Sequence, residues 1–132
     1  METLINKTIQ LSNASVSLTE EGYYFINVNE NTEVDLDLLK QIIASMSQLQ
    51  NKKKLPVLII MQSFSMPTEE ARTYLAKENS SPNAAAEAYV IHSMAQKIIG
   101  NFYLKVNKPA RPTKLFTGKT EALEWLKEFE NS

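Results

Sequence analysis

The sequence of 132 residues contains no cysteine, a single histidine and only 3 glycines. Without cysteine the chain can form neither a disulfide nor a thiolate-ligated metal site. Zinc and redox metals are bound mainly by Cys and His, so His92 alone leaves only metal sites built from oxygen ligands. We therefore expect no resident metal and no cofactor.

Excess charge and long hydrophobic runs are absent as well. The 14 basic and 15 acidic side chains give a net charge of -1, whereas a dedicated nucleic-acid binder presents a strongly basic surface. The longest uninterrupted apolar run, Val57 to Met61, is far shorter than the roughly 20 residues that cross a bilayer. The first residues lack the basic and apolar regions of a signal peptide. These features predict a cytoplasmic protein with no nucleic-acid partner and no membrane span.

The length and composition are typical of one globular domain. Hydrophobic residues make up 43% of the chain and charged residues 22%, which is enough apolar material for a proper core. We expect a single domain over residues 1–132, with its core between about residues 14 and 129.

The N-terminal part shows the pattern of β-strands. Polar and apolar side chains alternate from Ala14 to Glu20, and the segment from Tyr23 to Asn29 is rich in aromatic and β-branched residues. Glu21 and Gly22 between them favour a turn, so we expect an antiparallel hairpin.

Beyond the hairpin, helical and strand patterns alternate. Apolar residues spaced three and four apart predict a helix from Asp35 to Leu49, and the apolar run 55–61 predicts a strand buried on both faces. The other predicted elements are a helix over 68–79, a strand over 84–90, a helix capped by Ser93, a strand over 113–116 and a helix over 119–130 capped by Thr117. This order predicts an α/β fold: a mixed sheet that is parallel beyond the hairpin, covered by about four helices.

The helix after Ser93 has an unusually wide apolar face, formed by Met94, Ala95, Ile98, Ile99, Phe102 and Tyr103. Such a helix is either buried in its own domain or partly committed to a subunit interface, and we favour burial. In the alternative, Ile98, Ile99 and Phe102 form the interface of a symmetric homodimer.

Three stretches of the second half, 88–104, 111–116 and 121–126, resemble SpoIIAA-like proteins, which belong with the STAS domains, and in particular an uncharacterised bacterial branch of that group. The resemblance implies a SpoIIAA-like α/β fold, topologically related to CRAL-TRIO lipid-transfer domains, and a non-enzymatic regulatory role. The founding members switch partners when a serine is phosphorylated at the start of the helix after the central strand, within an Asp-Ser-Ser-Gly type motif. Ser63 and Ser65 lie in the corresponding stretch here, but the Asp and Gly are missing, so ordinary loop serines are the favoured interpretation.

The loop after the strand 55–61 is also the best candidate for a ligand pocket. Met61, Phe64 and Met66 place flexible apolar side chains at the carboxyl end of that strand, where open α/β sheets bind ligands, and Tyr74 follows on the next helix. The alternative is that the methionines simply fill gaps in the core.

Two further motifs contain side chains that could bind a charged partner or transfer a proton. Lys105, Lys108, Arg111 and Lys114 form a local basic cluster that could hold an acidic partner, although such clusters more often only solubilise the surface. His92 and Ser93 are adjacent and point to opposite faces, so they are poorly placed to share a proton. No catalytic constellation is left, and we expect a protein that is not an enzyme.

The leading interpretation is thus a non-enzymatic regulatory protein that binds a protein partner, and the alternative is a carrier or sensor of a lipid-like small molecule. Partner binding predicts an exposed apolar patch and a closed core. A carrier predicts a cavity of several hundred Å³ lined by Met61, Phe64 and Tyr74. An enzyme, the least favoured reading, would show a carboxylate with a strongly perturbed pKa in a cleft.

Overall fold

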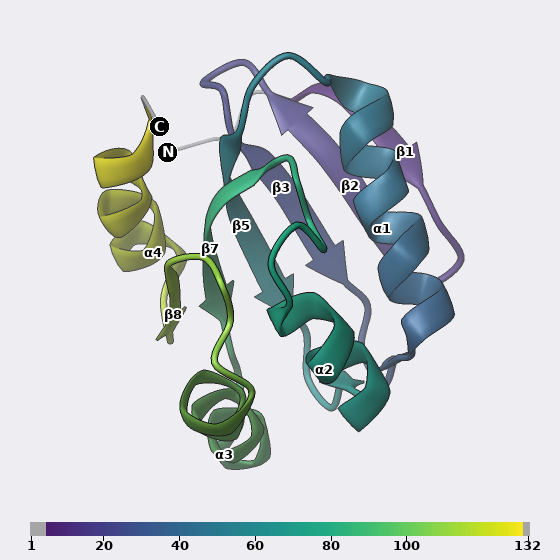
Figure 1. Ribbon diagram of the computed structural model, residues 1–132, viewed down its shortest axis with the longest axis vertical. Helices are drawn as coiled ribbons and strands as arrows, with labels where there is room; N and C mark the ends of the chain where they lie inside the picture. The colour runs from purple at the N-terminus through teal and green to yellow at the C-terminus, as the bar shows by residue number, and fades with distance from the viewer. Residues whose placement is uncertain (1–4, 131–132) are drawn as a thin grey trace.

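The computed structural model describes residues 5–130 and contains one large mixed β-sheet (Figure 1). Its strands are β1 (Ile5–Gln10), β2 (Ala14–Thr19), β3 (Tyr24–Val28), β5 (Leu55–Met61), β7 (Ala84–Val90) and β8 (Thr113–Phe116), which lie side by side in this order. Two short strands, β4 (Glu33–Val34) and β6 (Met66–Pro67), form a separate parallel pair. The helices are α1 (Leu36–Leu49), α2 (Glu69–Ala76), α3 (Met94–Phe102) and α4 (Lys119–Leu126), with a π-helix (Tyr103–Asn107) directly after α3 and a 3-10 turn (Lys127–Phe129) after α4.

The predicted hairpin is present and is extended by a strand that the sequence did not indicate. β2 pairs with β3 in antiparallel register, with Val16 opposite Ile26. β1 adds to the other edge of β2, also antiparallel. It was missed because the segment Ile5–Gln10 is mostly polar, as suits an edge strand with little apolar surface to bury.

The rest of the large sheet is parallel, as expected. β3, β5, β7 and β8 are joined in parallel pairs, and the successive connections carry α1, α2 and α3. Pro56 is fully buried near the start of β5, where the pairing with β7 shifts by one residue. This irregularity accommodates a residue that cannot donate a ladder hydrogen bond.

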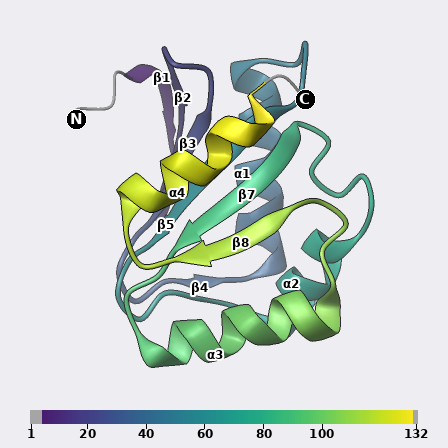
Figure 2. The ribbon, with the colours of Figure 1, turned by 90° about the vertical axis from the view of Figure 1, so that its left-hand side faces the viewer.

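The helices cover the sheet on both faces (Figures 1 and 2). α1 and α2 lie on one face, α3 runs along the edge where the parallel strands end, and α4 crosses the opposite face. Because α1, α2 and α3 all lie in connections between strands added in the same direction, right-handed crossovers place α1 and α2 on one face and bring α3 to the carboxyl end of that same face. The fold class inferred from the sequence, with antiparallel strands first, parallel strands next and four helices, is confirmed.

The helix caps follow the sequence except at α4. The side chains of Asp35, Thr68 and Ser93 accept hydrogen bonds from the first turns of α1, α2 and α3. The cap of α4 is Gly118 and not the expected Thr117. Gly118 has an extended backbone and makes no side-chain cap, and the acidic Glu121 lies in the first turn of α4.

Two hydrophobic clusters fill the two sides of the sheet. The cluster under α1 includes Val16, Tyr24 and Ile59, and the cluster under α4 includes Leu58, Ala88 and Leu126. Across residues 5–130 the structure shows no helix with the length and apolar character needed to span a membrane.

Candidate functional site

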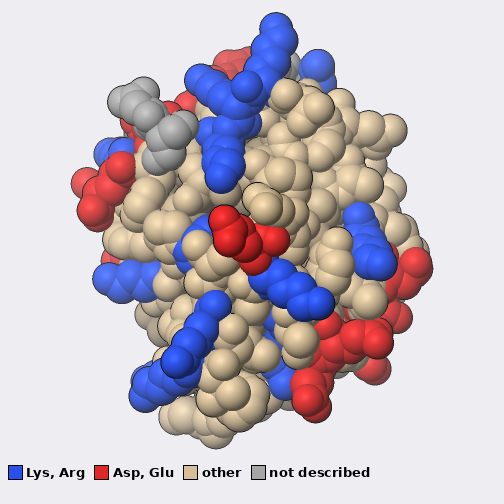
Figure 3. Space-filling view, viewed as in Figure 1, with Lys and Arg blue, Asp and Glu red and all other residues tan. Residues whose placement is uncertain are grey.

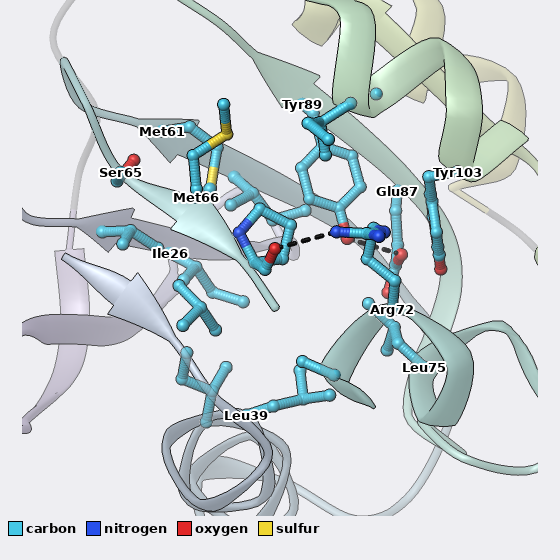
Figure 4. Close-up of a pocket in the computed structure, with 18 of the residues that line it drawn as sticks. Ile26, Leu39, Met61, Ser65, Met66, Arg72, Leu75, Glu87, Tyr89 and Tyr103 are labelled. Atoms are coloured by element: carbon cyan, nitrogen blue, oxygen red, sulfur yellow. Dashed lines mark hydrogen bonds between the residues drawn. The ribbon is translucent and has the colours of Figure 1, made fainter. Parts of the chain in front are cut away.

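A cavity of about 110 Å³ lies between the sheet and helices α1, α2 and α3. Its walls are mainly apolar, and they come from elements far apart in the sequence that meet on the same side of the sheet (Figure 4). Representative lining residues are Ile26, Leu39, Ile59, Met61, Met66, Ala71, Ile99 and Leu115. The cavity lies toward the carboxyl ends of the parallel strands, where the next element in each crossover leaves the sheet.

One end of the cavity is polar (Figure 4). Glu87 on β7 lies among the lining residues and is 4% exposed. Its Oε1 accepts a hydrogen bond of 3.0 Å from the Tyr89 hydroxyl and lies 3.7 Å from Nη1 of Arg111. Tyr103, the first residue of the π-helix, lines the same end. The four side chains form a buried polar cluster, named here the Glu87 cluster.

Burial controls the ionisation of this cluster. Desolvation raises the pKa of Glu87, and the Arg111 guanidinium and the Tyr89 hydroxyl oppose the increase without cancelling it. Burial also raises the pKa values of Tyr89 and Tyr103, and the nearby Glu87 carboxylate adds to both increases. Both phenols therefore stay protonated at neutral pH and can donate hydrogen bonds.

Arg111 is held mainly by backbone. Nη1 donates to the carbonyl of Leu75 at 3.0 Å, and Nη2 donates to the carbonyl of Lys77 at 3.2 Å and to the hydroxyl of Ser80 at 2.8 Å. The side chain is 8% exposed. Arg111 therefore does not belong to a surface basic cluster with Lys105, Lys108 and Lys114, as the sequence suggested; it joins the end of α2 to the Glu87 cluster.

Near the contact between α2 and the π-helix, three buried side-chain polar atoms lack a hydrogen-bond partner. They are the three such atoms among residues 7–130, whose side chains the structure describes. They are Nε of Arg72, the Tyr103 hydroxyl and Oδ1 of Asn107. Tyr103 and Asn107 lie on the π-helix, which packs against α2, the element that carries Arg72. Buried polar groups are normally paired, so three orphans at one junction require an explanation.

The outer face of α3 is exposed, contrary to the burial that we favoured. Met94, Ile98, Phe102 and Val106 are 68%, 61%, 45% and 59% exposed. Ile99 points the other way and lines the cavity. The expectation was wrong because α3 is apolar on two sides, and periodicity does not say which side faces the sheet. Within the interface predicted from the sequence, Ile98 and Phe102 are exposed and Ile99 is half-buried.

The predicted pocket is found in part. Met61 and Met66 line the cavity. Phe64 is 73% exposed and does not, and Tyr74 borders a separate groove with Leu36 and Lys77. Phe64 has a positive φ of 64°, which turns the loop so that the ring leaves the core. The volume of about 110 Å³ is also below the several hundred expected of a carrier.

The two candidate serines do not begin a helix. They precede β6, and α2 starts only at Glu69 after its cap Thr68. Ser65 is fully buried and donates to the carbonyl of Gln62 at 2.7 Å, so a kinase could not reach it in this conformation. Ser63 is half-buried, and its phosphorylation stays a prediction.

Gln96 is a structural residue that the sequence analysis overlooked. It is 4% exposed, and its Nε2 donates to the carbonyls of Gln62 at 2.8 Å and Ser65 at 3.0 Å. Its Oε1 accepts from the backbone N–H of His92. His92 Nδ1 lies 2.7 Å from the carbonyl of Met61, as suits a hydrogen-bonded histidine at a strand end. These contacts fix the start of α3 against the loop after β5.

Glu87 was also overlooked, although the sequence carries a signal for it. It is the one charged residue in the strand Ala84–Val90, which is otherwise apolar. A carboxylate inside a buried strand needs a partner. The local sequence does not indicate that this partner is Arg111, because Arg111 lies 24 residues further along the chain (111 minus 87). No group of three or more His, Asp or Glu side chains arranged to hold a metal ion is found in the described part of the chain.

Comparisons with known proteins give a family and a fold. The family model described as Domain of unknown function (DUF7793) matches residues 17–130. Among solved structures, the chain is similar to an uncharacterised DUF3478-family protein with a SpoIIAA-like fold from Shewanella loihica PV-4, with a TM-score of 0.54, 13% identity and 96% of each chain covered. No curated protein matches the sequence. The structural similarity confirms the SpoIIAA-like resemblance, and at this identity it shows the fold alone.

Proposed function

The chain belongs to the family described as Domain of unknown function (DUF7793), and from its geometry we propose that it is a non-enzymatic regulatory protein whose protein partner docks on the outer face of α3. The observation that carries the proposal is the row of exposed apolar side chains at 94, 98, 102 and 106. Met94, Ile98 and Phe102 lie four apart on one side of α3, and Val106 follows them in the π-helix, so the four form a stripe, named here the α3 stripe. Contiguous exposed apolar surface of this kind is typical of interaction sites.

The charge around the α3 stripe indicates the chemistry of the partner. The sequence has no Asp or Glu between Glu87 and Glu121, and Lys97, Lys105 and Lys108 are exposed beside the stripe. In Figure 3, Lys and Arg side chains and uncharged surface cover the lower left of the molecule, and acidic side chains gather at the lower right. An apolar segment flanked by Asp or Glu complements this surface. A second copy is less suited, because two α3 stripes face to face would bring like charges together.

The contacts of Glu87 and His92 support the proposal that the protein is not an enzyme. Glu87 has the raised pKa that an enzymatic carboxylate would show, but it is 4% exposed and its carboxylate contacts the side chains of Tyr89 and Arg111 in the same protein. The ring of His92 is bonded to a backbone carbonyl. The carrier alternative is disfavoured by volume, since a lipid-like chain needs more room than about 110 Å³.

The test is in-cell crosslinking from the α3 stripe. A photoreactive benzoylphenylalanine replaces Ile98, and the matched control carries it at Glu124, an exposed site on α4 whose side chain is 73% exposed. After irradiation in the cells of origin, we expect a crosslinked protein from position 98 and not from 124. The crosslinked peptide should contain apolar residues flanked by Asp or Glu. The yield should fall at least about tenfold when Lys97 and Lys105 are both replaced by Glu, because charge repulsion then replaces attraction.

Other outcomes contradict the proposal in distinct ways. A crosslinked species of twice the chain mass indicates a homodimer, and crosslinks to lipid alone indicate a membrane surface. Equal yields from positions 98 and 124, or a yield that the Lys-to-Glu double variant leaves unchanged, exclude specific docking on the α3 stripe.

A further inference from the structure

The cavity points to a second site, separate from the surface that the proposed partner uses. We infer that it binds a small, mainly apolar molecule carrying one hydroxyl or amide group, and that this group is bonded at the Glu87 cluster. The inference rests on the cavity, on the unpartnered polar atoms beside it and on the π-helix that carries two of them.

The size of the cavity limits the ligand. Engineered apolar cavities of roughly 150 Å³ hold a benzene molecule, which has six heavy atoms. A cavity of about 110 Å³ therefore fits a molecule of about four to six non-hydrogen atoms. Aliphatic walls from Ile26, Leu39 and Ile59 favour an apolar body without charge.

The polar end of the cavity specifies the polar group of the ligand. Tyr103 is 6% exposed and lines the cavity. The Arg111 guanidinium faces its hydroxyl, but no acceptor lies within hydrogen-bond distance of that hydroxyl. Because burial raises its pKa, this hydroxyl is protonated and donates to an acceptor oxygen. Figure 4 shows Tyr103, Glu87, Tyr89 and Arg72 together at this end, with Ile26, Met61 and Met66 at the other. A ligand with its oxygen toward Tyr103 and its carbon atoms toward Ile26 matches this division.

A positively charged ligand group fits less well. Arg111 already balances Glu87, and Arg72 brings a second guanidinium to the cavity wall. An ammonium ion would therefore enter beside two cations, with only the already paired Glu87 to balance it, at a high desolvation cost. A neutral hydroxyl or amide satisfies the Tyr103 hydroxyl without that cost.

The π-helix supports a functional reading of this end of the cavity. Single-turn π segments are rare and are frequently found at functional sites, because the widened turn leaves backbone and side-chain groups free for other contacts. Here the segment places Tyr103 at the cavity and ends at Lys108 in a left-handed conformation, with the Lys108 N–H bonded to the Tyr103 carbonyl at 2.9 Å. The unpartnered Asn107 oxygen lies in the same turn.

The probe for the test is cyclopentanol, with cyclopentane as the matched molecule that lacks the oxygen. Methyl resonances of the protein are followed by NMR while each probe is added. We expect saturable shifts of the Ile59, Met61 and Ile99 methyl groups with cyclopentanol, and unshifted methyl groups of Leu58 and Leu126 on the opposite face of the sheet. Cyclopentane should bind about fivefold more weakly, the ratio that corresponds to one hydrogen bond.

Matched variants locate the binding. Ala71→Leu adds three carbon atoms to the cavity wall and should abolish the shifts, and Ala95→Leu makes the same change at an exposed position on α3 and should leave them unchanged. Tyr103→Phe removes only the hydroxyl and should reduce cyclopentanol affinity about fivefold, to the level of cyclopentane. Tyr74→Phe, outside the cavity, should have no effect on that affinity.

Several results would overturn the inference. Methyl shifts that do not saturate would mean that the probes do not bind in the cavity. Equal affinity for cyclopentanol and cyclopentane would mean that the polar end does not bond the hydroxyl of the ligand. Binding that survives in folded Ala71→Leu lies elsewhere on the protein. If Ala71→Leu does not fold, Val34→Ile adds a single methylene to the same cavity, and unchanged affinity in that variant contradicts the inference equally. None of these measurements involves the α3 stripe. A failure of this inference therefore does not contradict the proposed partner binding, and a failure of the crosslinking test does not contradict this inference.

Discussion

The two sides of the large sheet are built from the same strands but packed in different ways. On the side of α4, buried alanines on β7 let the helix approach closely, and the contacts are apolar: Leu58, Ala86, Ala88, Ala122 and Leu126. On the side of α1, the alternate residues of β7 are Glu87 and Tyr89, and a cavity lies beside them. None of the described residues in the α4 cluster lines that cavity.

This difference assigns separate roles to the two sides. A strand presents successive side chains to opposite faces, so one seven-residue strand can supply a closed hydrophobic layer and a polar site together. The described residues of the cluster under α4 provide stability through apolar contacts. The α1 side is packed less completely. It contains a buried ion pair, unpartnered polar atoms and the cavity, and the α3 stripe lies exposed at its end.

The largest effect is expected from breaking the buried ion pair. Arg111→Ala leaves Glu87 without its counter-charge and releases the end of α2, so the free energy of unfolding should fall by about 3–5 kcal/mol. Urea denaturation measures the loss. The matched variant on the α4 side is Lys127→Ala, which breaks an exposed pair with Glu124 and should change stability by less than about 0.5 kcal/mol. Similar losses in both variants would contradict the contrast between the two sides.

The next effect comes from making the same enlargement on each side of the sheet. Ala88→Leu forces three carbon atoms into the closed α4 core and should cost about 3 kcal/mol. Ala71→Leu places them in the cavity and should cost less than about 1 kcal/mol, because the new side chain fills empty space. Denaturant unfolding of both variants gives the comparison. An equal cost would mean that the two sides are packed alike.

A smaller, pH-dependent effect should come from Glu87. Because its pKa is raised in the folded protein, its contribution to stability is fully present below the unfolded value near 4.5 and is lost as pH rises through the folded pKa. Glu87→Gln does not titrate there. The unfolding free energy of this variant minus that of the wild type should therefore increase between about pH 4 and about pH 8. A decrease would show that Arg111 outweighs desolvation. Glu124→Gln, at an exposed position on α4, is the control. Its unfolding free energy minus that of the wild type should not change over the same pH range.

The smallest effect on stability is expected at the α3 stripe. Ile98→Gln removes an apolar side chain that is 61% exposed, keeps a good helix former, and should change the unfolding free energy by less than about 0.5 kcal/mol. Thermal unfolding checks this. A loss of more than about 2 kcal/mol would show that Ile98 is packed inside the protein and would remove the α3 stripe as a docking surface.

The sequence predicted the elements with strong patterns and missed those without them. The helix from Leu36 and the buried strands Leu55–Met61 and Ala84–Val90 follow from periodicity and apolar runs, since such long patterns admit few other structures. β4 and β6 have two residues each, too few to show any period. β1 is polar because it lies at an edge.

The site was less predictable than the fold, for physical reasons. Met61 and Met66 could be placed at the cavity because Met61 ends the central strand and Met66 follows in the loop after it. The pairing of Glu87 with Arg111 depends on the order of β7 and β8 in the sheet, which local sequence does not encode. Ile98 is exposed and Ile99 lines the cavity because of how α3 is rotated about its axis, and an apolar pattern on both sides of a helix does not determine that rotation.

The most direct test of the contrast between the two sides is xenon binding observed through methyl NMR. Xenon enters enclosed apolar cavities and needs no knowledge of a natural ligand. Xenon pressure should shift the methyl groups of Ile42, Ile59 and Ile99 around the cavity, and should leave those of Leu58 and Leu126 under α4 unchanged. Shifts under α4, or no shifts on either side, would contradict the account.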